Sequence, residues 1–232
     1  MNTNSPTVPS QFVDLSQVVA PGIPRFGPHA PEPIIRPWMS HYTAGQSGKY
    51  DGCTCEITEI NMVTSMGTYL DSPYHFNPSG ASIDQLSLEQ LVLPGVVVDC
   101  TPCEPNQSIG PEVLQGLSFR DKAVLFRTDW SRFWEIPETY RRFPYLTEDT
   151  AKALTEGGAG LAGIDVLVID DTSNPRRPVH VTLLQSNVLI VENLANLSSL
   201  PREGFTFYAV PVKIAGAAAF PVRAFAVLDT QG

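Results

Sequence analysis

The sequence predicts a single α/β domain with a twisted mixed sheet and a β-rich core. Continuous apolar runs that suit buried strands recur at 96–100, 123–128 and 187–192. A helical segment at 147–156 lies between the strand-like runs 123–128 and 161–170, and the succession of strand, helix and strand is typical of mixed α/β folds. The chain has 232 residues, 43% of them hydrophobic and 17% charged, which is enough apolar content for one core.

Charge and the absence of apolar spans narrow the classes of function. The formal net charge is −9, from 15 Lys and Arg against 24 Asp and Glu. No basic stripe can neutralise phosphates, so nucleic acid and an anionic membrane surface are not expected as partners. No apolar run approaches the roughly 20 residues that span a bilayer, and residues 1–10 lack the regions of a signal peptide. We therefore expect a cytoplasmic protein with a flexible tail at 1–10 and one domain at 11–232.

The cysteines allow two interpretations. Cys53 and Cys55 form a C-x-C pair, and Cys100 and Cys103 form a C-x2-C pair. Four such thiols could hold a structural zinc ion, but C-x-C is not the spacing of a zinc ribbon. Buried reduced thiols are the favoured interpretation, with Cys53 and Cys55 on one face of a strand.

The N-terminal half alternates strand-like runs with punctuated segments. The run 12–16 is short and strand-like, and 53–63 is rich in Thr, Ile and Val, as strands are. The segment 82–91 predicts a short helix or helical turn. It is followed by the buried strand expected at 96–100.

The C-terminal half shows clearer helix signals. Pro111 suits the first position of a helix over 111–117. Thr147 is a good N-cap for the helix 147–156, which Gly157 and Gly158 end. A polar loop at 170–175 follows the expected strand 161–170, at the end of the strand where sites in α/β folds commonly lie. Further strands are expected at 187–192, 205–212 and 224–228.

Aromatic residues are concentrated in two segments. The proline-rich segment 20–39 contains Phe26 and Trp38. Its lack of regular pattern suggests either a lid that faces a substrate or a surface loop with an anchoring aromatic. The segment 132–145 carries five aromatic side chains, which suit a core more often than a pocket wall.

The stretch from Thr64 to Phe76 holds the densest set of chemically useful side chains. We expect the preceding strand to break at Gly67, and Pro73 to fix a tight segment that holds Asp71 and His75 on a rigid corner. Considered alone, this carboxylate and imidazole could equally be a turn cap and a half-buried ring.

This stretch resembles the signature of the cyclase family of hydrolases, which includes bacterial kynurenine formamidases (arylformamidases) and isatin hydrolases. The family signature is His-x-Gly-Thr-His-x-Asp-x-Pro-x-His-Phe. Ser65 and Tyr69 stand where the family has two metal-ligand histidines. The matching positions are Gly67, Thr68, Asp71, Pro73, His75 and Phe76.

The resemblance extends from Asp14 to Ala226. It includes the phrase Arg127-Thr128-Asp129-Trp130-Ser131, where the family has glycine in place of Asp129, a His before Leu-Leu at His180, and a Glu before Asn-Leu at Glu192. It implies the swivelling β/β/α-like cyclase fold and a homodimer. It also implies that the region 20–39 of one protomer walls the active site, in some members that of its partner.

The resemblance also implies a site. A cage of Ser65, Tyr69 and Asp71 would be empty, because neutral hydroxyls are poor metal ligands at neutral pH. Asp71, His180 and Glu192 would instead hold a single zinc or manganese ion. Substrate-binding roles are expected for Ser65, Phe26 and Trp38.

Three functions remain open at this stage. The first is metal-assisted hydrolysis of a small amide, formamide, cyclic imide or lactone, with His75 as proton relay and Tyr69 as donor to the developing oxyanion. The second is a metal-independent cyclase, dehydratase or isomerase in which His75, paired with Asp71 or Glu192, acts as the general base and Tyr69 as the acid. The third is a non-catalytic relative that binds a small ligand. The site residues also have structural alternatives: Asp71 as a turn cap, His180 as a core ring, or Glu192 paired with Arg223.

Overall fold

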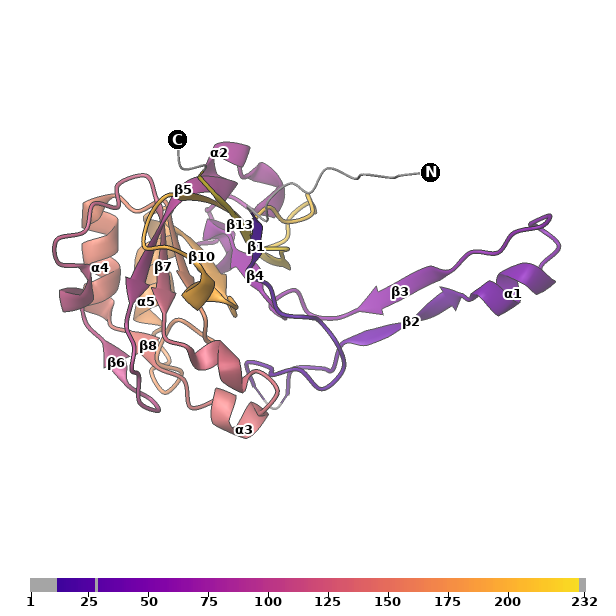
Figure 1. Cartoon of the computed structure of the whole chain (residues 1–232), viewed down its shortest axis with the longest axis horizontal. Helices are drawn as coiled ribbons and strands as arrows, with labels where there is room; N and C mark the ends of the chain where they lie inside the picture. The colour runs from indigo at the N-terminus through magenta and orange to yellow at the C-terminus, as the bar shows by residue number, and fades with distance from the viewer. Residues whose placement is uncertain (1–11, 28, 230–232) are drawn as a thin grey trace, which may run out of the picture.

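A curled sheet, helices packed on its face and a long projecting arm make up the molecule (Figure 1). The computed structural model describes residues 12–27 and 29–229, so the tail expected at 1–10 lies outside the described residues. In this part of the chain nine strands form one sheet, in the order β1-β13-β11-β5-β7-β9-β10-β4-β12. The central strands β5, β7, β9 and β10 are parallel, and the flanking strands pair antiparallel.

The strands of this sheet are β1 (Phe12–Asp14), β4 (Tyr69–Asp71), β5 (Val92–Asp99), β7 (Ala123–Arg127), β9 (Leu161–Ile164), β10 (Leu189–Glu192), β11 (Phe205–Tyr208), β12 (Ala219–Pro221) and β13 (Phe225–Leu228). Two smaller sheets pair β2 (Ile34–Met39) with β3 (Ile57–Asn61), and β6 (Ser108–Ile109) with β8 (Tyr145–Leu146). The α-helices are α1 (His41–Gln46), α2 (Leu88–Leu91), α3 (Pro137–Tyr140), α4 (Glu148–Gly157) and α5 (Pro178–Gln185). Short 3-10 turns include Pro73–His75, Ile83–Gln85, Pro111–Leu114, Trp130–Phe133 and Leu197–Ser199.

The sheet divides the core into two apolar clusters. Val96 and Val98 of β5 belong to the cluster beneath α4 and α5, whereas Val97 belongs to the cluster on the opposite face. Successive side chains of a strand point to opposite faces, so a continuous apolar run fits a strand covered on both sides. The α/β fold with a β-rich core, predicted from such runs, is therefore confirmed.

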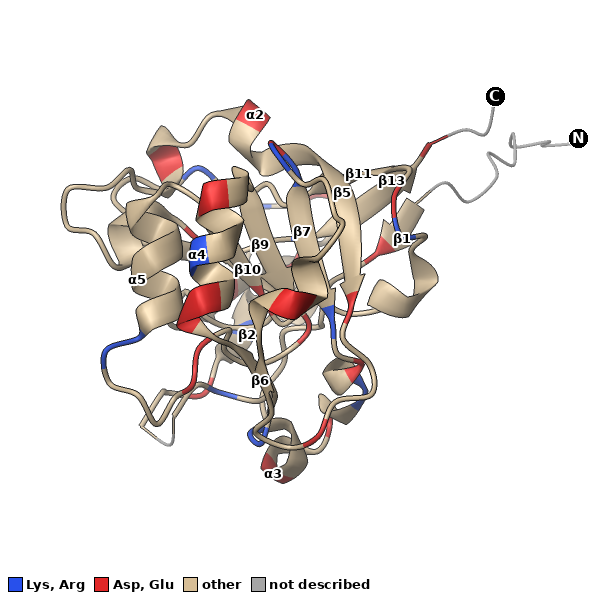
Figure 2. Cartoon of the chain, turned by 90° about the vertical axis from the view of Figure 1, so that its left-hand side faces the viewer, with Lys and Arg blue, Asp and Glu red and all other residues tan. Residues whose placement is uncertain are grey.

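The helix predicted at 147–156 is also confirmed. The Thr147 hydroxyl accepts a hydrogen bond from the backbone N of Thr150 at 3.2 Å, as an N-cap does. Gly158 ends α4 with φ +77°, a left-handed conformation that glycine adopts without steric cost. Acidic positions recur on α2, α4 and the neighbouring loops (Figure 2).

The segment 20–39 was predicted to be irregular, and this is wrong for its second half. Ile34–Met39 forms β2, which pairs antiparallel with β3 and forms an arm that projects from the body (Figure 1). Pro37 is tolerated because a two-stranded ribbon has unpaired edges. Helix α1 lies at the tip of the arm (Figure 1). Ser40 caps α1, accepting from the backbone N of Thr43 at 3.2 Å.

The cysteine prediction holds only in part. All four thiols are free, but Cys53 is exposed and the other three are partly buried. Cys53 and Cys55 precede β3 rather than sharing its face, because the strand pairing with β2 begins only at Ile57.

The strand expected at 161–170 ends at Ile164. Asp165 follows directly, and its Oδ1 accepts hydrogen bonds from the backbone N of Thr128 at 2.9 Å and from the Thr128 hydroxyl at 2.6 Å. These bonds hold the chain against the end of β7 instead of continuing the ladder with β10. The following residues run irregularly beneath the site described below.

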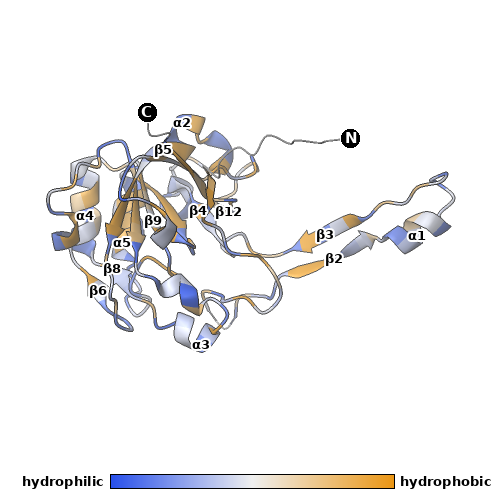
Figure 3. Ribbon diagram, viewed as in Figure 1, coloured by the Kyte–Doolittle hydropathy of each residue, from blue (hydrophilic) through white to orange (hydrophobic). Residues whose placement is uncertain are grey.

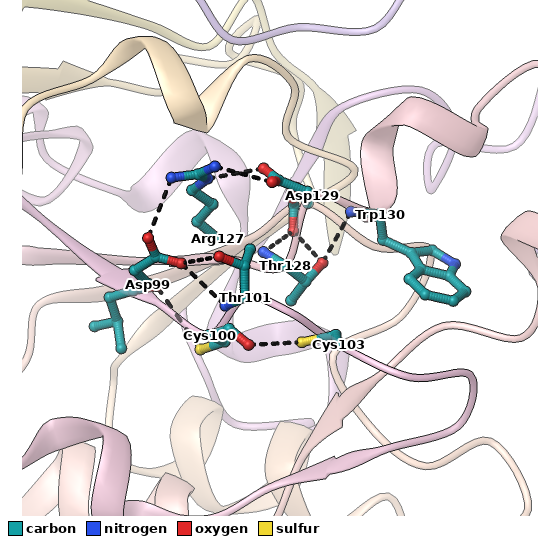
Figure 4. Close-up of polar contacts among 10 residues, drawn as sticks. Asp99, Cys100, Thr101, Cys103, Arg127, Thr128, Asp129 and Trp130 are labelled. Atoms are coloured by element: carbon teal, nitrogen blue, oxygen red, sulfur yellow. Dashed lines mark hydrogen bonds and ion pairs between the residues drawn. The ribbon is translucent and has the colours of Figure 1, made fainter.

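The end of β7 explains one departure from the family pattern. Asp129, at the family's glycine position, has φ +57°, a left-handed conformation that Asp tolerates better than most residues. Its two carboxylate oxygens accept from Arg127 Nε at 2.7 Å and Nη2 at 2.9 Å, and Arg127 also contacts Asp99 of β5 (Figure 4). The Arg127 guanidinium thus joins the ends of β5 and β7, and the Asp129 carboxylate holds it in place.

The aromatic segment 132–145 and the lengths of the helices can be compared with the sequence analysis. Trp134, Tyr140 and Phe143 are buried in the core, as expected for the aromatic segment 132–145. No helix among the described residues is long and apolar enough to cross a membrane.

Candidate active site

Two neighbouring strands and one helix bring three potential ligands together. Asp71 lies at the end of β4, and Glu192 lies at the end of β10, which pairs with β4 antiparallel. His180 lies on α5. One ligand atom from each residue lies within 4.8 Å of the others, and within residues 12–27 and 29–229 this is the one such group of three or more.

Asp71 is the unusual member of this group. Its side chain is fully buried, and neither carboxylate oxygen has a hydrogen-bond partner among the described residues. Burial beside Glu192 raises the pKa of Asp71 well above its usual range. A buried carboxylate without partners is costly unless a cation or proton neutralises it.

A second carboxylate fixes His180. Asp170 Oδ2 accepts from the backbone N of His180 at 2.9 Å and contacts its ring Nδ1 at 2.7 Å. Asp170 Oδ1 accepts from the backbone N of Val179 at 2.9 Å. The ring's Nε2 is left to face Glu192 Oε1 at 3.4 Å and Asp71 Oδ2 at 3.8 Å. This carboxylate–imidazole pair orients the ring as metal sites commonly do.

Glu192 is held from two sides. Its Oε1 accepts from the backbone N of Ile169 at 2.6 Å. Its Oε2 accepts from the Tyr69 hydroxyl. Burial and the neighbouring carboxylates raise the pKa of Tyr69 well above its usual range, so this hydroxyl keeps its proton.

His75 lies at the mouth of the group. Its Nε2 is 3.8 Å from Asp71 Oδ1, and 31% of its side chain is exposed. Burial and the nearby His180 lower the pKa of His75, so its ring is neutral at pH 7. Its ring contacts Phe76 edge-on, with centroids 4.8 Å apart.

A cavity of about 210 Å³ opens onto these residues, smaller than the 300–1,000 Å³ typical of sites for drug-sized ligands. Its walls are Phe26, Ser65, Tyr69, His75, Phe76, Val168, Arg177, His180 and Glu192. The arrangement joins a small, partly apolar chamber to a polar floor with one unpartnered carboxylate.

Comparisons with known proteins agree with this arrangement. The sequence model of the Cyclase family, described as "Putative cyclase", matches residues 13–171. A kynurenine formamidase from Salinibacter ruber is 31% identical over 175 residues, which cover 75% of this chain and 81% of that protein. The chain belongs to the cyclase family.

Solved structures of the family extend the likeness to most of the chain. Isatin hydrolase A from Labrenzia aggregata has a TM-score of 0.81 at 25% identity, covering 94% of this chain and 93% of that one. A structure described as a predicted metal-dependent hydrolase from Bacillus stearothermophilus has a TM-score of 0.72 at 26% identity, covering 93% and 97%. These relatives identify the chain as a cyclase-family hydrolase.

In this cyclase-family hydrolase most of the residues chosen from the sequence meet at one place. Six of them line the cavity, and Asp71 lies beneath it, within the three-residue group. Trp38 does not line it. It lies on β2 in the arm, 66% exposed. The cavity residues among the predicted set are Phe26, Ser65, Tyr69, His75, His180 and Glu192.

Two structural alternatives are wrong. Arg223 does not pair with Glu192, because its guanidinium contacts Asp14 at 2.6 and 2.9 Å. Asp71 does not cap a turn, since its oxygens accept no hydrogen bond from the described residues.

Sequence reasoning missed Asp170 and Arg177. Asp170 opens the polar loop that was noted at 170–175, and two acidic residues at that point were a usable signal. Arg177 lies just before Pro178 at the start of α5, and no pattern in the sequence distinguished it from other surface arginines.

Proposed function

We propose that this protein hydrolyses a small amide, formamide, cyclic imide or lactone, with one zinc or manganese ion held by Asp71, His180 and Glu192. The observation that carries the proposal is Asp71, whose two buried oxygens accept no hydrogen bond from the described residues and lie 3.8 Å from His75 Nε2 and from His180 Nε2. The hydrolase names of the relatives support the reaction class.

The donor set fits a divalent ion. It offers one imidazole nitrogen and two carboxylate oxygens, a hard-to-borderline combination that suits zinc or manganese. His180 presents Nε2 because Asp170 engages Nδ1, and Glu192 is oriented by Tyr69 and Ile169. Residues that orient ligands in this way raise affinity for a metal.

In the proposed reaction a bound cation and His75 would supply different parts of the chemistry. A bound cation would polarise the scissile carbonyl and ease the ionisation of water. His75, neutral at pH 7 and open to the cavity, accepts a proton from the attacking water as its oxygen bonds to the carbonyl carbon. The same ring then gives the proton to the leaving nitrogen or oxygen as the bond to carbon breaks.

The role of Tyr69 differs from the one expected from the sequence. Its hydroxyl hydrogen is engaged by Glu192, so it is not free to donate to an oxyanion. We assign it as a positioning residue that holds the Glu192 carboxylate toward His180.

The projecting arm supports a homodimer. Several large apolar side chains on β2, α1 and β3 are exposed, including Trp38 at 66% and Ile60 at 58%. Hydrophobic residues recur along β2 and β3 (Figure 3). Exposed apolar patches of this kind are typical of interaction sites. The arm extends away from the body of the molecule (Figure 1), and Trp38 does not line the cavity, so Trp38 would contribute to a substrate site only in a partner protomer.

Elemental analysis of protein purified without a metal-affinity tag tests the proposal. We expect about one zinc or manganese per chain, lost in Asp71→Ala and His180→Ala, together with turnover of formamide, imide or lactone substrates. Protein that binds neither ion after incubation with each would overturn the single-ion hydrolysis. It would direct attention to acid–base chemistry without metal.

A further inference from the structure

Arg177 lines the same cavity, and its charge is unmatched. Its Nη1 is buried without a hydrogen-bond partner among the described residues. No carboxylate in residues 12–27 and 29–229 lies within ion-pair distance of its guanidinium. What distinguishes Arg177 from the other arginines without an ion pair is that its buried Nη1 belongs to a residue that lines the cavity. A buried donor on a charged group is costly to leave unpaired, which points to a partner that arrives with the ligand.

The backbone of Arg177 is held in a strained conformation. Its φ is +48° and ψ is +55°, the left-handed region that a long side chain rarely adopts. Its backbone N donates to Asn174 O at 3.2 Å, and its O accepts from Val181 N at 3.0 Å. Pro178 follows as the first residue of α5. Strain that the surrounding structure maintains is concentrated at functional sites.

The chemistry of the cavity indicates what the guanidinium would bind. Arginine remains charged in proteins and presents a planar set of donors that matches a carboxylate in a two-point contact. The carboxylate of Glu192 is already engaged by Tyr69 and Ile169. Phe26, Phe76 and Val168 supply apolar walls in a space of about 210 Å³. The complement of this chamber is a small, flat, apolar molecule with one anionic group.

We propose that Arg177 selects the substrate by binding a carboxylate that the substrate carries. The inference rests on the proposed function for the reaction itself. Arg177 is therefore a specificity-determining residue, and the preferred substrates are small aromatic amides or formamides bearing a carboxylate.

A matched pair of substrates tests the selection. 2-Formamidobenzoate and formanilide share the formamide and the ring, and differ in the carboxylate. We expect wild type to prefer the acid in kcat/KM, and Arg177→Gln to lower that preference by about 10- to 100-fold, mostly through KM. Arg177→Lys should keep part of the preference, because it retains the charge without the two-point geometry. Arg176→Gln, a change at the adjacent exposed arginine, should keep the wild-type ratio.

A binding measurement separates this inference from the proposed reaction. We expect calorimetry to show 2-aminobenzoate binding to wild type, and binding about 10- to 100-fold weaker in Arg177→Gln with metal content unchanged. If wild type hydrolyses neither substrate but binds 2-aminobenzoate through Arg177, the hydrolysis proposal fails and the carboxylate site stands. The proposed carboxylate site is overturned if wild type does not bind 2-aminobenzoate. Equal affinity in wild type, Arg177→Gln and Arg177→Lys, or an unchanged substrate preference in both variants, also overturns it.

Discussion

Replacing Asp71 with asparagine should have opposite effects on stability with and without a divalent ion. In chelator, wild type must bury an unpartnered carboxylate or protonate it. The effective penalty of a buried charge is several kcal/mol, and an unsatisfied amide costs about 1–3 kcal/mol. The variant should therefore gain about 1–2 kcal/mol, a rise in melting temperature of roughly 2–8 °C for a domain of this size.

At a saturating concentration of the ion, wild type should instead melt at a higher temperature than Asp71→Asn. At a free ion concentration of 100 times Kd, binding stabilises wild type by about 2.7 kcal/mol, or roughly 5–11 °C. If loss of the Asp71 carboxylate weakens binding about 100-fold, the variant gains only about 0.4 kcal/mol at the same concentration. Melting curves of both proteins, in EDTA and in zinc or manganese, measure the two orders directly.

The pH dependence in chelator has a defined sign. The pKa of Asp71 is raised in the folded protein, above the value of about 3.9 in the unfolded chain. The unfolded chain therefore loses this proton first, and the Asp71 contribution to stability falls as pH rises above about 4. The difference between Asp71→Asn and wild type should widen from pH 4 upward.

A second buried carboxylate provides the control. Asp165 is also buried, but accepts two hydrogen bonds from Thr128. Asn keeps an oxygen that can accept both of these bonds, so Asp165→Asn should shift the melting temperature by the same small amount in both conditions, with the ion-induced gain unchanged. The reasoning about Asp71 is refuted if Asp71→Asn melts below wild type in chelator, or if the ion raises its melting temperature as much as that of wild type.

Four further predictions concern the roles proposed for His75, Tyr69 and Trp38. His75→Gln should lower kcat by about 10²- to 10⁴-fold with metal content unchanged. In wild type the activity should fall on the acid side only below about pH 6.5, because the pKa of His75 is lowered and its neutral ring is the base. Tyr69→Phe should weaken ion binding by about 10- to 100-fold, measured by competition with a chelating dye, since Glu192 loses a hydrogen bond. Trp38→Asp should convert a dimer to a monomer in light scattering, while a monomeric wild type would remove the basis for this role of the arm.

The parts of the fold that sequence predicted well are those where burial sets the pattern. The apolar run from Val96 to Val98 was recognised because β5 is covered on both faces, and α4 was recognised because both of its ends carry capping signals. The strand expected at 53–63 is present as β3, but β2 and its pairing into the arm were missed because the two strands have no covered face within the chain. Without a buried face there is no hydrophobic alternation to read, and the prolines then dominate the pattern.

The difference between local pattern and tertiary contact also explains which residues of the candidate site were predicted. Asp71, His180 and Glu192 were found through motif resemblance, and their convergence depends on the pairing of β4 with β10 and on α5, which are far apart in sequence. Asp170 and Arg177 act through a loop whose path follows from Asp165 leaving the sheet to bind Thr128. Local sequence carries no signal for a bond between residues 37 positions apart.

Charge balance relates Tyr69, which stands where the family signature has a histidine, to the proposed ligands Asp71 and Glu192. The family histidine expected there is neutral when it binds a metal, and the phenol of Tyr69 is neutral as well, so the change leaves the charge of the site unaltered. Asp71 and Glu192 together carry two negative charges when they act as ligands, which one divalent ion cancels. A buried site must be close to neutral. In the proposed site the Tyr69 hydroxyl would therefore replace a bond to the ion with a hydrogen bond to Glu192. The cost of this exchange should appear in affinity for the ion rather than in the charge state of the site.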